Sequence, residues 1–230
     1  RDVRERFNAE FQKPKLLLRS ETFLEPRNPA HAQLVGTAFD YVLRLHLAII
    51  NENVWERTWI SEDAIERLEL ALSLKWPVFV SGSQRSTRGL LAKSRRFIED
   101  AKDHFDRCCE TGEVSDDMLR SALLLAQLDA YYRCALLSDG FGEVDNADVI
   151  DLRALHGVLA NLPDSPFSAS RLCVLNPDFG KAWELVGGAD ADVLIDETLI
   201  ELKTTKQHEF SAEMFRQLMG YYVLHEIGGI

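Results

Sequence analysis

The sequence predicts a mixed α/β (α+β) fold, in which a small mixed sheet is flanked by helices and carries a helical insertion. Three observations predict it. Apolar side chains recur at three- and four-residue steps over residues 33–51, and a similar helical pattern fills residues 61–160. Short apolar runs typical of strands follow over residues 171–204, before a last helical pattern over residues 211–226. This order is typical of one domain with a mixed sheet.

The first helix is predicted over residues 33–51, directly after a loop that contains two prolines. Because a helix has 3.6 residues per turn, residues three and four positions apart point the same way. The apolar residues that share this face are Leu34, Ala38, Tyr41, Leu45 and Ala48. The spacing indicates an amphipathic helix.

Residues 55–162 are predicted to be a helical insertion within a single domain that spans residues 1–230. Ser61 and Ser115 are suited to be N-caps, because acidic residues follow each of them in the first turn, where the helix dipole favours negative charge. Ser211 is the predicted N-cap of the last helix.

Three or four strands are predicted after the insertion. The runs 171–179, 189–196 and 198–205 are apolar or rich in Val, Leu and Ile, and residues 182–188 lie between the first two. The last two runs are close enough in sequence to form a hairpin.

The hairpin is predicted to turn at Glu197 and Thr198, which pairs Asp192 with Lys203 across the two strands. Directly opposed residues point to the same face, and alternation along each strand extends that face. Four charged residues are then predicted to share one face: Asp190, Asp192, Glu201 and Lys203. The opposite face is predicted to pack on the core through Val193, Ile195, Ile200 and Leu202.

Carboxylates on one small surface repel one another unless a cation lies among them, and burying them unpaired is costly. Oxygen ligands without histidine or thiolate suit Mg²⁺ or Mn²⁺ better than zinc. Asp192 is favoured over Asp190 as the main ligand, because it lies nearer Glu201 in the predicted register. Lys203 is then placed to hold or deprotonate a water, or to neutralise charge on an attacked phosphate. The alternative is that Lys203 only pairs with a carboxylate on a solvent-exposed hairpin.

Composition limits the class of protein. Hydrophobic residues make up 46% of the chain, which suffices for a core. The net charge of −11 and a pI near 5.0 argue against overall electrostatic attraction to nucleic acid, although a local basic patch stays open. No apolar run of about 18 residues and no secretion leader is evident, so a soluble cytoplasmic protein without a membrane partner is expected. The chain begins at Arg1 rather than at methionine, and we expect it to be a piece of a longer polypeptide.

The cysteines show neither a CxxC pair nor the spacing of zinc ligands, and they are predicted to be buried free thiols in a reducing cytosol. They are Cys108, Cys109, Cys134 and Cys173.

Polar residues in three separate segments match one known pattern. They are, in chain order, Gly36, Thr37 and Asp40, then Asp190 or Asp192, then Glu201, Lys203 and Thr204, and last Gln217 and Tyr221. Together they resemble the PD-(D/E)xK nuclease superfamily, and in particular its RecB-like branch, where histidine is common at the position of Asp40. The resemblance covers residues 33–50 and 170–225 and leaves the helical middle unmatched.

The resemblance implies a restriction-endonuclease-like core and a divalent-metal-dependent nuclease that hydrolyses DNA phosphodiester bonds, as an exonuclease or an endonuclease. It implies that Asp40, the hairpin aspartates and Glu201 surround Mg²⁺ or Mn²⁺. It also implies that Lys203 is catalytic, and that Gln217 and Tyr221 position the substrate or Lys203. RNA stays open as a substrate. Some relatives hold an iron–sulfur cluster through cysteines that flank the core, but the cysteines here lack that distribution, and no cluster is predicted.

Other interpretations stay open. Gln217 and Tyr221 share a helix face with apolar neighbours, which is also typical of core packing. Asp40 precedes Arg44 by one helical turn, as in a helix-surface ion pair. The same fold is compatible with a catalytically inactive binding or scaffolding module in a DNA-processing or phage-defence complex. Its helical insertion, or flanking segments missing here, would then contact a protein partner.

A basic cluster lies in the insertion, formed by Arg85, Arg88, Lys93, Arg95 and Arg96. Arg85 and Arg88, together with Thr204 beside the hairpin, are predicted to bind the substrate, because phosphate contacts need local cations. The alternative is a solvated helix face balanced by the acidic residues Glu99, Asp100 and Asp103. No motif for reading a base sequence is evident.

Overall fold

The computed structural model of the protein describes residues 2–14, 24–56, 58–80, 83–135, 137–138, 140–163, 166–204 and 209–229. Its helices are α1 (Asp2–Glu10), α2 (Ala32–Ile50), α3 (Ile60–Ser73), α4 (Thr87–Thr111), α5 (Asp116–Cys134), α6 (Asn146–Ala160), α7 (Lys181–Val186) and α8 (Ala212–Gly228), and a 3₁₀ turn, η1 (Pro29–His31), precedes α2. Its strands are β1 (Val54–Glu56), β2 (Val78–Val80), β3 (Ser83–Arg85), β4 (Cys173–Leu175), β5 (Val193–Ile195) and β6 (Thr198–Ile200).

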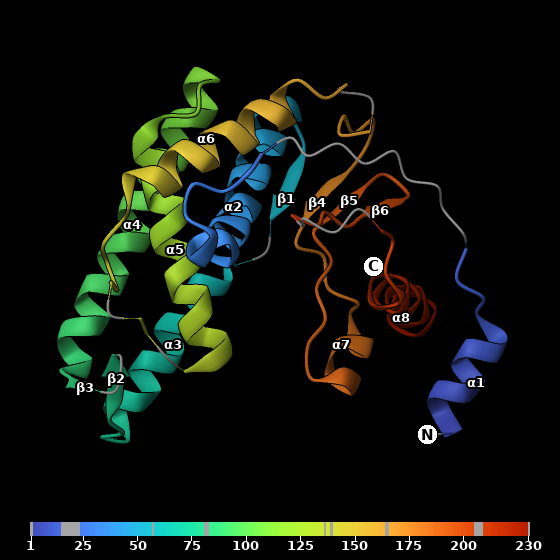
Figure 1. Ribbon diagram of the computed structural model, residues 1–230, viewed down its shortest axis with the longest axis horizontal. Coiled ribbons are helices and arrows are strands. Elements are labelled where there is room, and N and C mark those ends of the chain that lie inside the picture. The colour runs from blue at the N-terminus through green and yellow to red at the C-terminus, as the bar shows by residue number, and fades with distance from the viewer. Residues whose placement is uncertain are drawn as a thin grey trace.

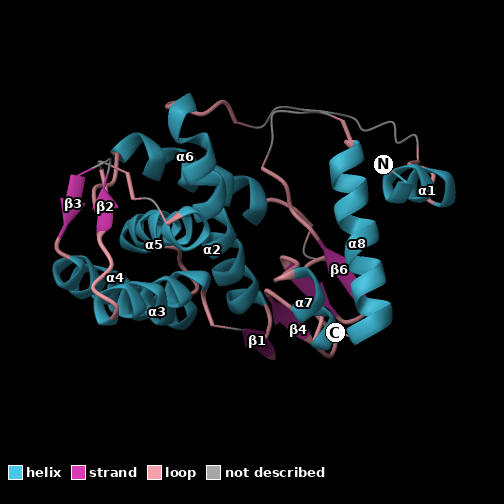
Figure 2. Cartoon of the chain, turned by 90° about the horizontal axis from the view of Figure 1, so that it is seen from below, coloured by secondary structure: helices cyan, strands magenta, loops and turns pink. Residues whose placement is uncertain are grey.

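The predicted α/β class is confirmed, with a mixed four-stranded sheet in the order β1-β4-β5-β6. Strands β1 and β4 are parallel, whereas β4, β5 and β6 are antiparallel to their neighbours. The sheet lies between the helical bundle and α8, with α1 beyond α8 (Figures 1 and 2). Parallel neighbours need a long crossover. The chain between β1 and β4 supplies it, and this crossover corresponds to the predicted insertion.

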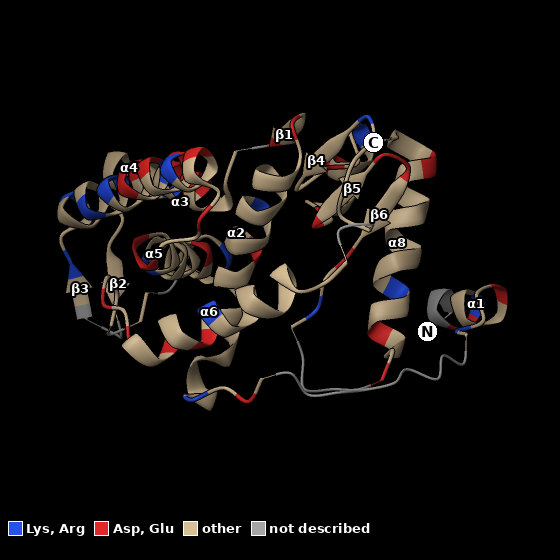
Figure 3. Cartoon of the chain, turned by 90° about the horizontal axis from the view of Figure 1, so that it is seen from above, with Lys and Arg blue, Asp and Glu red and all other residues tan. Residues whose placement is uncertain are grey.

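Two local predictions were wrong, and one open alternative is settled. The middle segment is interrupted by the β2–β3 hairpin, which lies at the end of the bundle far from the sheet (Figures 1 and 3). The fourth strand left open for residues 182–188 is absent, because Lys181–Val186 form helix α7 between Gly180 (φ 53°) and Gly187 (φ 74°). Ser61 is not an N-cap, because α3 already begins at Ile60. The other two predicted caps are correct, since Ser115 and Ser211 each accept a hydrogen bond from the backbone N–H three residues on.

Helix α2 is the centre of the main core. Ala38, Tyr41 and Leu45 on its predicted face are buried, and so are Val42 and Leu43, because helices α3 to α6 and the sheet enclose the helix. A second, smaller cluster lies between α7, α8 and the start of the hairpin. It contains Phe179, Ala182, Ala191, Tyr221 and Leu224.

One segment in the described part of the chain, Pro29–Ile50, is long and apolar enough to cross a membrane by length and composition, which the sequence analysis did not anticipate. Half of it is buried inside the protein. It also carries the buried cation Arg44. These features are those of the core helix of a soluble protein.

The cysteines are free thiols, as predicted. Cys108 and Cys173 are buried, but Cys109 is half-buried and Cys134 is exposed, so the prediction of burial holds for only two of them.

Candidate functional site

The β5–β6 hairpin differs from the predicted register by two residues. Leu194 lies opposite Leu199, and the turn falls at Asp196 and Glu197. Asp196 has a φ of 51°, and its carboxylate accepts hydrogen bonds from the backbone N–H groups of residues 170–172. These bonds hold the pKa of Asp196 well below its ordinary value. The anchored aspartate therefore fixes the start of the turn.

A shift of two residues leaves every side chain on its predicted face. Val193 and Ile195 are buried in the core, and Ile200 and Leu202 pack against it, as predicted. Continued by one pair, the observed register places Asp192 opposite Glu201 instead of Lys203. The two carboxylates thus become direct neighbours across the hairpin.

Glu201 is largely enclosed, since its side chain is only 8% exposed. Its Oε1 accepts hydrogen bonds from Gln217 Nε2, at 2.9 Å, and from Lys203 Nζ. Its Oε2 is buried and has no hydrogen-bond partner among the described residues. Burial, and next the charge of Asp192, raise the pKa of Glu201, while Lys203 opposes this effect. This carboxylate has one oxygen to offer to another group.

Asp192 is held by the opposite strand. Its Oδ2 accepts a hydrogen bond from the backbone N–H of Leu202 at 2.6 Å. Burial raises the pKa of Asp192, and this hydrogen bond and the charges of Lys203 and Arg44 oppose the increase. The bond fixes one carboxylate oxygen in a defined orientation next to Glu201.

Asp40 brings a third carboxylate from α2 to the same place. Burial raises the pKa of Asp40 to about 7, and the charge of Asp192 is the next largest cause. Arg44 and Arg133 lower it. Two segments far apart in the sequence therefore place their acids within electrostatic reach of each other.

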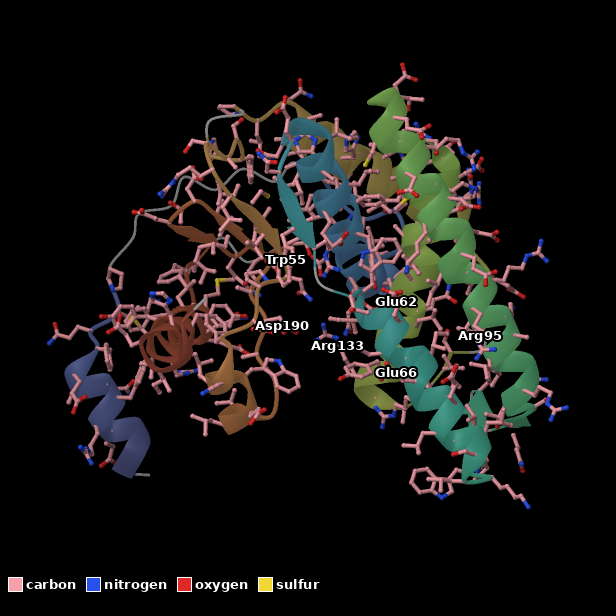
Figure 4. All side chains as sticks on the ribbon, turned by 180° about the vertical axis from the view of Figure 1, so that it is seen from behind. Trp55, Glu62, Glu66, Arg95, Arg133 and Asp190 are labelled. Carbon is pink, nitrogen blue, oxygen red and sulfur yellow. The ribbon has the colours of Figure 1, made fainter. Side chains whose placement is uncertain are left out.

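Asp190 contributes a backbone carbonyl, which accepts a hydrogen bond from the Tyr221 hydroxyl at 2.7 Å. It also forms an isolated antiparallel bridge with Asp178. Figure 4 shows Asp190 on the side of the molecule that faces Arg133 at the edge of the helical bundle. The backbone of Asp190 thus ties the entry of the hairpin to α8.

Helix α8 closes the site through one continuous set of hydrogen bonds. Gln217 Nε2 donates both to Glu201 Oε1 and, at 2.7 Å, to the Tyr221 hydroxyl. The Tyr221 ring stacks on Phe179 with centroids 5.1 Å apart. Burial raises the pKa of Tyr221 to about 12. The tyrosine therefore belongs to the smaller core and to the site at once.

Gly36 and Thr204, which both belong to the motif pattern, lie against each other. A Cβ atom on Gly36 would come within 2.7 Å of Thr204 Oγ1. The absence of a side chain at Gly36 lets the strand end that carries Glu201 and Lys203 approach α2 closely.

Sequence reasoning missed a polar layer beneath these acids. Arg44 is buried, with its guanidinium 5.2 Å from the centre of the Tyr41 ring and Nη1 3.9 Å from Glu56 Oε1. Tyr41 donates to Asp129 Oδ1 at 2.7 Å. Arg44 is thus no partner in a surface ion pair. Asp40 and Arg44 interrupt an otherwise apolar helix, and this was the signal that could have revealed the layer.

Arg85 and Arg88 do not join the site. They lie on β3 and in the first turn of α4, at the end of the bundle opposite the sheet (Figures 1 and 3). The prediction that they contact the same substrate region as the hairpin has no support in this arrangement.

The carboxylate oxygens at this site are the type of ligand that a hard cation prefers. The described residues contain no group of three or more His, Cys, Asp or Glu side chains arranged to hold a metal ion. Mg²⁺ is commonly held by one or two carboxylates, with water and substrate phosphate completing its octahedron. Asp192 and Glu201 supply such a pair, and the unpartnered Glu201 Oε2 is a natural donor.

Fold and site together define an α/β protein with a buried cluster of carboxylates and one lysine, reached from two distant parts of the chain. No protein-family model, no curated protein and no solved structure matches the chain significantly.

Proposed function

We propose that this chain is a divalent-metal-dependent nuclease of the RecB-like branch of the PD-(D/E)xK superfamily, with a restriction-endonuclease-like core, and that it hydrolyses DNA phosphodiester bonds. One observation carries the proposal. The Asp192–Glu201 pair of the hairpin, and Gln217 with Tyr221 from α8, meet beside Lys203, and Asp40 from α2 lies within electrostatic reach of Asp192.

In this proposal Asp192 and Glu201 hold Mg²⁺ or Mn²⁺, with Asp40 beside them. The cation supplies Lewis-acid stabilisation of charge on the phosphate. Lys203 orients the attacking water or, once it has given up its own proton, deprotonates that water; its side chain is 40% exposed and its nitrogen contacts Glu201. Gln217 and Tyr221 hold Glu201 and the entry of the hairpin in place.

The decisive test is cleavage by purified protein. Linear, circular and single-stranded DNA, and RNA, are each incubated with Mn²⁺, Mg²⁺ or chelator. We expect cleavage of DNA only with metal, and a loss of at least about a hundredfold in Lys203→Ala, the scale of general acid–base contributions. Lys181→Ala removes an exposed lysine on α7 and should retain full activity. Equal activity in Lys203→Ala and the parent would remove Lys203 from the mechanism.

Metal titration distinguishes this function from a scaffolding role. Calorimetry with Mn²⁺ should detect a site in the parent that is lost in Glu201→Gln, a change that keeps the size of the side chain. A correctly folded parent without measurable Mn²⁺ binding or cleavage would favour the inactive binding module.

A further inference from the structure

Positive charge is concentrated in one stretch of this acidic chain. Residues 70–98 contain no Asp or Glu and six Lys or Arg, which leaves 20 of the 26 basic residues to set against all 37 acids elsewhere. The six are Lys75, Arg85, Arg88, Lys93, Arg95 and Arg96. Such segregation exceeds what solubility requires and is typical of a surface for a polyanion.

The stretch folds into one end of the helical bundle, from the last turn of α3 through β2 and β3 into α4 (Figures 1 and 3). Arg95 pairs with Glu69 at 2.5 Å, and Arg96 lies 3.8 Å from Asp100. Lys75, Arg85 and Arg88 are exposed, and they make no ion pair or hydrogen bond through their side chains within the described residues. These three cations are free to meet a ligand.

Large apolar side chains are exposed among these cations. Trp76 is 58% exposed and Phe79 is 41% exposed, although both belong to residue types that proteins usually bury. A groove of about 410 Å³ lies between α3 and α4, and its lining includes Leu72, Leu91 and Arg88 as well as the paired residues Glu69 and Arg95. Val78 lies opposite Arg85 and Phe79 opposite Gln84, so Phe79 and Arg85 point to opposite faces of the β2–β3 hairpin, whereas Trp76 follows Lys75 directly in the chain.

We infer that Lys75, Trp76, Arg85 and Arg88, called here the basic aromatic surface, bind single-stranded nucleic acid. Exposed rings stack on unpaired bases, and neighbouring cations contact the phosphates between them. In a duplex the bases are already paired and stacked on one another, so they are not available to stack on exposed aromatic rings. An acidic partner helix would need one continuous apolar stripe, which the intervening cations break.

This surface lies at the end of the bundle that is far from the sheet and its hairpin (Figure 1). It therefore goes beyond the proposed cleavage site as a second contact with nucleic acid. Binding there needs neither metal nor Lys203, so it can be tested whether or not the chain cleaves DNA.

The test is fluorescence anisotropy with labelled oligo-dT and with a labelled duplex, in chelator, over a range of salt concentrations. We expect the full chain to prefer oligo-dT. Trp76→Ala should weaken binding roughly five- to a hundredfold, as for loss of one stacked base. The double variant Arg85→Ala/Arg88→Ala should weaken binding and lower the slope of log K against log salt by about 1.4, the single-strand value for two lost phosphate contacts.

Matched controls separate this surface from general effects. Trp55 is also 58% exposed but lies on β1, and Arg107 is an exposed arginine of α4 outside the basic stretch. Trp55→Ala and Arg107→Ala should bind oligo-dT like the parent, and circular dichroism checks that all variants fold. The inference is overturned if Trp76→Ala binds as tightly as the parent, if the controls lose as much, or if an acidic peptide binds where oligo-dT does not.

Variants of the two sites keep the hypotheses apart. Glu201→Gln should lose cleavage and retain oligo-dT binding in chelator. A parent that binds oligo-dT but never cleaves would end the nuclease proposal and leave the basic aromatic surface standing.

Discussion

Tyr221 contributes both to core packing, through its ring, and to the candidate site, through its hydroxyl. Tyr221→Phe keeps the ring on Phe179 but removes the hydroxyl that joins Gln217 to the carbonyl of Asp190. We expect cleavage or Mn²⁺ affinity to fall roughly 10- to 100-fold, as for other groups that orient a metal ligand. The melting temperature should fall by only several degrees, since each of the two hydrogen bonds lost contributes about 1 kcal/mol. Unchanged cleavage and unchanged Mn²⁺ affinity in Tyr221→Phe would show that Tyr221 acts only in core packing.

Asp129 should make the stability of the protein depend on pH. Burial raises the pKa of Asp129 to about 6, against the opposing hydrogen bond from Tyr41. The folded state then keeps a proton that the unfolded chain releases near pH 4. The resulting stability is present below about pH 4 and is lost as the pH rises to about 6, by roughly 2 to 3 kcal/mol.

Asp129→Asn keeps an acceptor for Tyr41 and cannot ionise. Urea unfolding between pH 4 and 7.5 should show that this variant gains stability relative to the parent as the pH rises. Asp40 titrates in both proteins, and since the charge of Asp129 contributes to the raised pKa of Asp40, the difference reports Asp129 together with this coupling. Asp103→Asn, an exposed change on α4, should leave the slope of the parent intact. A parallel pH profile in Asp129→Asn would contradict this assignment.

At the residue scale, the sequence predicted correctly which hairpin side chains share a face. The register was wrong by two, yet Asp192 and Glu201 stayed on one face because side chains alternate with period two. The proximity of Asp40, Gln217 and Tyr221 came from resemblance rather than from local pattern. The Tyr41–Asp129 pair could not be foreseen, because nothing local shows which buried polar groups meet across a bundle.

At the scale of elements, the contact between α2 and the end of the hairpin can be measured directly. Gly36→Ala should gain up to about 1 kcal/mol of helix propensity, but its Cβ would meet Thr204 Oγ1 at 2.7 Å. We therefore expect the single change to gain less than the same change made in Thr204→Ala. Urea unfolding of the four proteins in the double-mutant cycle gives the coupling. Strict additivity would mean that the two elements do not constrain each other.

Elements were predictable in proportion to their length. Helix α2 was placed within one residue at each end, because its repeat is long and regular. The three-residue strand β1 carries almost no pattern of its own, since it exists through pairing with β4. Helix α7 exposes Leu185 and Val186, and these apolar residues in a short segment are also compatible with a strand. The distance between Arg85 and the hairpin could not be predicted, because local sequence pattern does not report long-range packing.

For the whole molecule, the two clusters predict two levels of stability. Helices α2 and α5 lie in the large core, whereas α8 rests on the five-residue cluster around Phe179. Amide hydrogen exchange should therefore be faster in α8 than in α2 and α5. Phe179→Ala, a change of a fully buried ring, should speed exchange in α8 and leave α5 protected. Simultaneous loss of protection in α5 and α8 would show one cooperative unit instead.

The crossover between β1 and β4 also sets the order in which the protein is made. A ribosome releases Asp40 and Arg44 with α2, then translates the entire bundle before the hairpin and α8 emerge. Until then the acid and the guanidinium of α2 lack the strand and helix that enclose them, and the carboxylate cluster does not exist. The carboxylate cluster of a nascent chain therefore stays incomplete until α8 has been translated.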